Sequence, residues 1–267
     1  MDEGSETPFV ARLWMTPLEA RNMVLGSDQV KVAEFDATYQ SILNDLTTLR
    51  RLGKETTGLW KAHEQRVNSG HIARVKNGMV EVDETIDEQL LHNVETIIKN
   101  AAGTVKRFQF LTRLFGIDTG FLYQKLPNFR VGVEALARTD NALADYMVEA
   151  RKWTEPIIKL RDDLEHAPFV APRVGYAITP QGGVQALEMP VMGMPLSAFI
   201  PTLLSRLNRY VEEVLMWCVQ RTASPIVVTE IPLIARNKQK PERFRLGLAG
   251  GAQPWVIIYS DDEFDRI

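Results

Sequence analysis

Apolar residues recur at alternating gaps of three and four positions along several long stretches of this chain, which is the pattern of helices that bury one face. The clearest stretch begins after Ser27 or Asp28, either of which can cap a helix, and runs to about Leu52. Its stripe consists of Val32, Phe35, Tyr39, Ile42, Leu46 and Leu49. A similar stripe predicts another long helix over about 196–221. Both helices are expected to face a bundle or another subunit.

Further helices are expected between these two. Residues 54–69 have weaker helical character. Thr85 and Glu88 have the spacing of a capping box, and the apolar residues that follow predict a helix that ends near Gly116. Another long helix is predicted over about 130–153.

A proline interrupts the pattern after this helix. Pro156 lacks an amide hydrogen and its ring clashes with the preceding turn, so the sequence predicts a break or kink there. Thr154 can then cap a fresh helical segment. Pro168 disfavours helical geometry at the residue before it, so this segment is expected to end at or just after His166.

Alternating or β-branched residues beside turn signals predict strands in three regions. The Asn77-Gly78 pair suits a type I′ turn and predicts a hairpin near 72–82. A glycine-containing turn predicts a second hairpin within 173–190. The region 223–267 is rich in strand-forming residues. Its expected strands are 226–235, 244–248 and 255–259.

The elements together predict a mainly α fold, a helical bundle of four to five long helices with β-hairpin insertions and a small β-rich C-terminal region. Residues 1–27 contain two prolines and little periodicity, and are expected to form an N-terminal arm. Residues 28–222 form the bundle with its two hairpins, and 223–267 extend the same domain. A length of 267 residues fits one large domain.

Composition excludes several classes of protein. Hydrophobic residues make up 45% and charged residues 24%, as in an ordinary globular protein, and a net charge of -3 argues against general coating of nucleic acid. The single cysteine, Cys218, excludes a disulfide framework, and the four histidines lack metal-ligand spacing, so no metal and no cofactor is expected. Without a long apolar run or a basic leader, we expect a cytoplasmic protein and no membrane contact.

The candidate chemistry lies at the end of the helix that Pro168 delimits. Arg161 places a fixed cation near His166, whose imidazole titrates close to neutral pH. A guanidinium can hold a phosphate while an imidazole moves a proton, so the two suit phosphodiester chemistry. Asp162 lies four residues before His166 and can orient the ring, and Glu165 is a possible supporting carboxylate.

Helical geometry places a condition on this site. Arg161 and His166 are five residues apart, which on an ideal helix separates them by about 140° in projection. They can act together only if the last turn opens or a second subunit completes the site. The structural alternative is an ordinary surface pair between Arg161 and Glu165, with His166 acting as a cation at a helix C-terminus. Arg66 and His71 have the same spacing but lack acidic neighbours.

The segment Arg161-Asp162-x-x-x-His166, within an all-α bundle, resembles the motif of the HEPN superfamily. The resemblance covers about residues 30–222. Asn is the commoner residue after the arginine in that family, and Asp162 is a tolerated variant. Many members are dimeric, metal-independent ribonucleases, whereas others lack activity and bind partners or nucleotides.

The resemblance implies a metal-independent endoribonuclease in phage defence or a toxin role. His166 would take the proton of a ribose 2′-hydroxyl, and Arg161 would stabilise the charge on the phosphorane. RNA would be the substrate, a homodimer the working form, and an antitoxin or other protein a possible partner. The candidate RNA-binding residues are Arg151, Lys152, Lys159 and Arg173. The alternative is a non-catalytic HEPN-like interaction or dimerisation module that binds a protein partner or a nucleotide.

Overall fold

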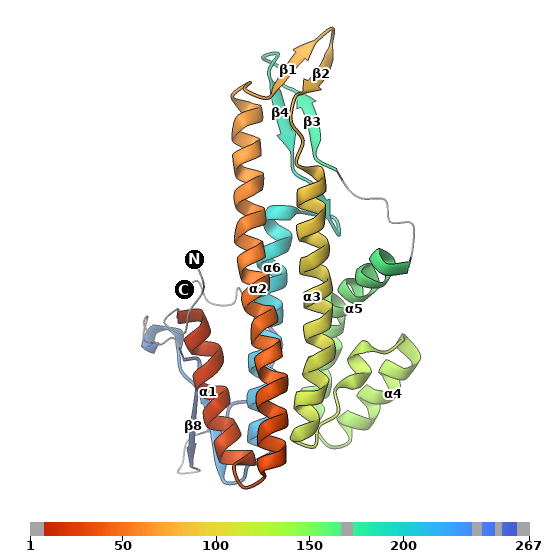
Figure 1. Ribbon diagram of the computed structural model, residues 1–267. Helices are drawn as coiled ribbons and strands as arrows, with labels where there is room; N and C mark the ends of the chain where they lie inside the picture. Colours follow the sequence, from red (N-terminus) through yellow and green to blue (C-terminus); the bar gives the residue numbers. More distant parts are fainter. Residues whose placement is uncertain (1–7, 167–172, 237–241, 249–252, 261–267) are drawn as a thin grey trace. The chain divides into compact units, whose positions relative to one another are not determined.

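The computed structural model describes residues 8–166, 173–236, 242–248 and 253–260, and within them the fold is mainly α, as predicted (Figure 1). The helices are α1 (Pro8–Leu25), α2 (Gln29–Asn68), α3 (Asp87–Leu114), α4 (Leu126–Ala137), α5 (Asn141–His166) and α6 (Leu196–Thr222), with short 3-10 turns η1 (Gly120–Tyr123) and η2 (Leu233–Ala235). The strands form two-stranded antiparallel sheets.

The chain divides into two compact units. Unit 1 comprises Met1–Thr47, Ala101–Ile158 and Ser205–Ile267, and unit 2 comprises Thr48–Asn100 and Lys159–Leu204. Unit 1 therefore contains α1, α4, the C-terminal region and parts of the long helices. Unit 2 contains the two hairpins that precede α6 and the remaining parts of the long helices.

The expected N-terminal arm is largely helical, since residues 8–25 form α1. The helix continues through Pro17, although the prolines of this segment predicted irregular structure. Tertiary contacts hold α1 against the first part of α2 in unit 1. The hydroxyl of Tyr39 donates to the carbonyl of Leu13, and the Arg21 guanidinium binds the carboxylate of Asp36 at 2.5 Å.

Helix α2 is one continuous element of 40 residues, whereas the sequence pattern suggested a strong helix followed by a weaker one. Asp28 caps its start, because the side-chain Oδ1 accepts hydrogen bonds from the amides of Val30 and Lys31. The predicted stripe is buried from Phe35 to Leu49, and Val32 is half-buried.

The break predicted at Pro156 does not occur. The chain breaks earlier, at residues 138–140 between α4 and α5, and α5 then runs without interruption from Asn141 to His166. Thr154 is fully buried inside the helix and does not cap a new one. Packing decides this outcome, since Trp153, Thr154 and Ile157 around the proline are all buried.

Helix α6 is the most deeply buried helix of unit 1. Every residue from Leu207 to Val219 is buried, including the single cysteine, Cys218. Four of these buried residues are polar or charged: Asn208, Arg209, Glu212 and Glu213. A buried charged side chain needs a partner, and the two glutamates find theirs in Arg243 of the C-terminal region and, for Glu213, also in Tyr146 of α5.

The C-terminal region contains fewer strands than predicted. Strand β7 (Ile226–Glu230) pairs with β8 (Phe244–Leu248), while residues 231–235 leave the sheet and 255–259 are extended without joining a strand ladder. The amide of Trp255 still donates to the carbonyl of Val228 at 2.9 Å. The basic segment 237–241 lies outside the described residues.

Unit 2 contains both predicted hairpins. Strand β1 (Ala73–Lys76) pairs with β2 (Met79–Val82), and Asn77 and Gly78 have the positive φ angles that the type I′ turn requires. Strand β3 (Gly175–Ile178) pairs with β4 (Val184–Leu187). The two hairpins lie against each other at the end of α2, with β1 beside β4 and β2 beside β3 (Figure 1). Two short strands, β5 (Pro190–Val191) and β6 (Met194–Pro195), precede α6, so Pro195 ends a strand instead of starting the helix.

Candidate functional site

The predicted site at the end of α5 is an exposed cluster of charges on an intact helix. One Arg161 nitrogen lies 3.0 Å from the carboxylate of Asp162, and another lies 2.8 Å from that of Glu165. The imidazole Nε2 of His166 lies 3.8 Å from the same Glu165 oxygen that contacts Arg161. The His166 side chain is 75% exposed, so it lies at the surface of the part of the chain that the structure describes.

This geometry differs from the predicted one in its carboxylate. Asp162 was expected to orient the imidazole, but it pairs with Arg161, and Glu165 is the acidic group beside the ring. The helix continues through His166, so the last turn does not open to bring Arg161 and His166 onto one face. Arg161 and His166 could therefore act together only if a second subunit completed the site.

The candidate RNA-binding residues have different environments. Arg151 is buried, and its guanidinium donates to the carbonyls of Leu122 and Gln124 and to the carboxylate of Glu155. It also stacks over the ring of Phe129, with 4.7 Å between the guanidinium carbon and the ring centroid. Arg151 therefore holds η1 and the start of α4 against α5 and is not available to a phosphate backbone.

The other three cations are at the surface. Lys152 pairs with Glu149, one turn earlier on α5, at 2.6 Å. Lys159 and Arg173 are both exposed. Their exposure is compatible with contact to an anion, but it is equally the ordinary state of a surface cation.

Unit 1 contains a buried charged network that the sequence analysis did not identify. The Arg243 guanidinium contacts Glu213 at 2.6 Å and Glu230 at 2.8 Å, and it approaches Glu212 at 3.9 Å. The hydroxyl of Tyr146 donates to the other Glu213 oxygen at 2.9 Å. The only sequence signal was the pair of adjacent glutamates inside the apolar run of α6.

Burial changes the ionisation of this network. Burial raises the pKa of Glu213 above its ordinary value, although Arg243, Arg209 and the Tyr146 hydroxyl oppose that shift. Burial disfavours the charge of Arg243, but the carboxylates of Glu213, Glu212 and Glu230 outweigh it and raise the Arg243 pKa. The network ties the segment before β8 to α6, so we interpret it as structural.

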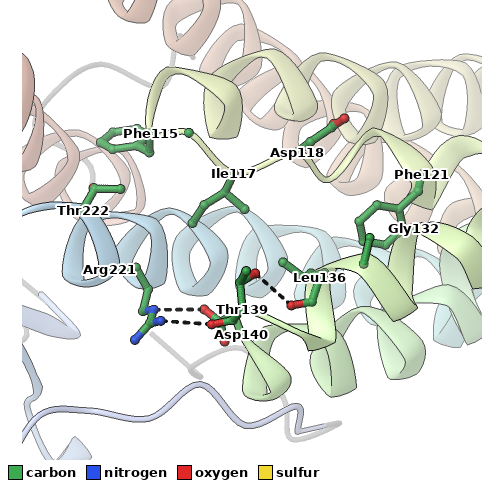
Figure 2. Close-up of a pocket in the computed structure, with 12 residues that line it drawn as sticks. Phe115, Ile117, Asp118, Phe121, Gly132, Leu136, Thr139, Asp140, Arg221 and Thr222 are labelled. Carbon is green, nitrogen blue, oxygen red and sulfur yellow. Dashed lines mark hydrogen bonds and ion pairs between the residues drawn. The ribbon is translucent and has the colours of Figure 1, made fainter.

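A cavity of about 520 Å³ lies elsewhere in unit 1, between the ends of several helices (Figure 2). Its volume is within the range of about 300–1,000 Å³ typical of small-molecule sites. The lining comes from the turn that follows α3, from η1, from α4 and the turn after it, and from the end of α6. The residues are Phe115, Gly116, Ile117, Asp118, Phe121, Gly132, Ala135, Leu136, Thr139, Asp140, Arg221 and Thr222.

Asp140 organises the polar end of this cavity. One of its oxygens accepts the Leu143 amide at 3.0 Å and so caps α5. The other accepts the indole N–H of Trp217 at 2.6 Å and lies 3.2 Å from the Nε of Arg221. Arg221 also donates to the carbonyl of Thr139 at 3.2 Å, so two contacts fix the plane of its guanidinium (Figure 2).

The described residues contain no group of three or more histidine, cysteine or acidic side chains arranged to hold a metal ion. In the same part of the chain, no helix has both the length and the apolar character needed to cross a membrane.

Comparisons of the chain with protein-family models, with curated proteins and with solved structures found no match. Two regions of the chain have geometry suited to a function: the end of α5 in unit 2 and the cavity in unit 1.

Proposed function

We propose that this chain is a non-catalytic, HEPN-like helical module that acts through association, with homodimer formation as its first activity. The observation that carries the proposal is the surface position of His166 on an unbroken helix. A general acid or base works inside a site that positions its substrate and excludes water. Within the described residues, His166 is 75% exposed and has neither feature.

The charges around the motif support a non-catalytic role. Asp162, Asp163 and Glu165 outnumber Lys159 and Arg161 in the last two turns of α5. The Arg161 guanidinium already contacts two carboxylates, so a phosphate would have to displace them. A polyanion such as RNA is repelled by such a surface, particularly at low salt.

Exposed apolar side chains in the C-terminal region support association. Ile234 is 97% exposed, and Leu248 and Ile258 are also exposed although they are large and apolar. All three belong to the C-terminal region, and burial of such side chains against a partner would remove their apolar surface from water. The C-terminal region of unit 1 is therefore the proposed contact surface.

Analytical ultracentrifugation of the full chain tests this proposal. We expect a dimer at micromolar concentration, and at least a tenfold weaker dimer in the double variant Ile234→Asp with Ile258→Asp. Val30→Asp is the matched control, because Val30 is an exposed apolar residue at the start of α2 in the same unit. A wild-type monomer at all concentrations, or equal weakening by Val30→Asp, contradicts the proposed surface.

A second candidate function is a dimeric, metal-independent endoribonuclease. The observation that favours it is that Arg161 and His166 both contact Glu165 and both reach solvent at the end of α5. A two-fold axis near this end would add a second Arg161–His166 pair to the first. His166 of either copy would then move the 2′-hydroxyl proton while an Arg161 stabilises the phosphorane.

RNA cleavage in the presence of EDTA decides between the two functions. The test compares wild type with Arg161→Ala and His166→Ala, and with Arg66→Ala and His71→Ala as matched controls of identical spacing. Cleavage that is lost in the first pair and kept in the second supports the nuclease. No cleavage by a folded wild-type protein, or cleavage that all four variants keep, supports the non-catalytic module.

A further inference from the structure

We propose that the cavity between the ends of α3, α4 and α6 binds a small organic anion, a carboxylate or phosphate ester with an aromatic or branched aliphatic body. This site lies in unit 1 and is independent of the α5 end and of the association proposed above. Three features support this ligand: the hydrogen-bonding groups that remain available in the cavity, its apolar walls and a neighbouring cavity.

Arg221 is the group available to an anion. Its side chain is 49% exposed and comes from the last turn of α6 (Figure 2). A guanidinium has five N–H donors, and the contacts to Asp140 and Thr139 use two of them within the described part of the chain. Three donors remain for a ligand. A fixed guanidinium with free donors matches the paired oxygens of a carboxylate or a phosphate.

The carboxylates in the lining are already engaged. Asp140 accepts from the Leu143 amide, the Trp217 indole and Arg221, so both of its oxygens have partners. Asp118 accepts from the Gly120 amide at 2.8 Å and pairs with Arg113 at 3.2 Å. Each lining carboxylate is therefore paired with an arginine, Asp118 with Arg113 and Asp140 with Arg221, and the N–H groups of Arg221 that Asp140 and Thr139 do not use favour an anionic ligand.

The walls favour an apolar body on that anion. Phe115 is buried, while Ile117, Phe121 and Leu136 are half-buried and line the same space. Their partly exposed surfaces would be removed from water by a flat or branched apolar group.

A second cavity, of about 400 Å³, adjoins the first at Arg221. Its walls include Trp217 and Trp255, with Pro225 and Pro254 beside them. Arg221 lies in the lining of both spaces. An anionic group at Arg221 therefore has apolar surface on two sides, and a ligand with a second apolar substituent can extend into this space.

Titration calorimetry at low salt with defined probes tests the proposal. The anionic probes are 2-naphthoate and 1-naphthyl phosphate, which distinguish a carboxylate from a phosphate ester. The neutral probe is 2-naphthamide, which has the same body without the charge. We expect at least one anionic probe to bind wild type, and to bind at least tenfold more tightly than the neutral probe.

Two variants identify the site. Arg221→Gln should weaken the anionic probe at least tenfold while leaving the neutral probe nearly unchanged. Arg66→Gln is the matched control, since Arg66 is also 49% exposed, lies in the last turn of a helix and pairs with an acidic residue. Ala135→Phe fills the cavity from an exposed position on α4 and should abolish binding of every probe without unfolding the protein.

Three results overturn the proposal. These are failure of both anionic probes to bind wild type, equal weakening by Arg221→Gln and Arg66→Gln, and unchanged binding in a folded Ala135→Phe protein. Circular dichroism melting of each variant shows that the fold is retained. None of these outcomes depends on whether the chain dimerises or cleaves RNA.

Discussion

The Nη1 of Arg243 lies 2.6 Å from the Oε1 of Glu213, a carboxylate with no exposed surface. The two residues are 30 positions apart, one just before β8 and the other inside α6. Breaking a buried pair by removing one partner typically costs about 3–5 kcal/mol, because the other charge stays buried without compensation. This contact therefore makes the C-terminal hairpin part of the fold of unit 1.

The first prediction concerns the pH dependence of stability at Glu213. Burial raises its pKa above the ordinary value near 4.5, so between 4.5 and the raised pKa the folded state binds more protons than the unfolded state. The contribution of Glu213 to the free energy of unfolding is then largest below pH 4.5 and falls as the pH rises through this window. Glu213→Gln removes the titration, so its stability relative to wild type should increase with pH.

Urea unfolding at a series of pH values measures this difference. Tyr146→Phe is the companion variant, because it removes a hydroxyl that donates to the Glu213 carboxylate and opposes the raised pKa. Its loss of stability should grow with pH, opposite in sign to Glu213→Gln. A constant difference between wild type and Glu213→Gln at every pH would contradict the prediction.

The second prediction separates two adjacent cations of α5. Arg151→Met leaves the carbonyls of Leu122 and Gln124 without their donor, and should destabilise the protein by about 2–4 kcal/mol. Lys152→Met removes the same charge from an exposed site and should change stability by less than about 0.5 kcal/mol. Thermal unfolding of both variants is the measurement. Equal effects would show that Arg151 is a surface cation after all.

The third prediction concerns two glycines inside helices. A Cβ at Gly132 in α4 would overlap the side chain of Phe121, so Gly132→Ala should destabilise the protein by at least about 1–3 kcal/mol. A Cβ at Gly58 in α2 meets nothing nearby, and Gly58→Ala should stabilise it by up to about 1 kcal/mol. Chemical denaturation measures both changes. The prediction fails if the two substitutions shift stability in the same direction.

The fourth prediction concerns His63, which is buried in unit 2 with its Nε2 3.0 Å from the Tyr176 hydroxyl. Burial lowers its pKa, although Glu84 and Asp87 oppose the shift, so the unfolded state binds more protons just below the ordinary value near 6.5. The contribution of His63 to stability is present above pH 6.5 and is lost as the pH falls through the lowered pKa.

His63→Gln removes this titration. Its stability relative to wild type should therefore be lowest above pH 6.5 and should improve as the pH falls, which unfolding in urea between about pH 7.5 and 5 can measure. Parallel stability curves for wild type and His63→Gln across this range would contradict the prediction.

Local patterns predicted much of the secondary structure. The Asn77-Gly78 pair predicted its hairpin because only a few residues accept the positive φ angles of a tight turn. The stripe from Phe35 to Leu49 predicted the buried face of α2. Irregular structure was predicted at Pro17 and a break at Pro156, but both prolines lie inside helices. A proline removes a helical hydrogen bond, and burial of the surrounding residues outweighs that loss.

The candidate site was predictable only in part. The sequence predicted the pair of Arg161 and Glu165, because residues four apart on a helix are neighbours. It could not show that Asp162 turns to Arg161, nor that Arg151 is buried, since both depend on side-chain packing. The cavity at Arg221 was not predicted because its lining comes from two segments, 115–140 and 221–222, that are far apart in the chain.

The sequence by itself determined a mainly α protein with two hairpins and a titratable motif at a helix end, because periodicity, turns and helix spacing are local properties. The tertiary structure alone decided which charges are buried together, as with Arg243 and Glu213, and which cation faces an apolar cavity, as with Arg221. These arrangements depend on long-range packing, because a buried charge needs an opposite charge close to it in space, and that partner can lie anywhere along the chain.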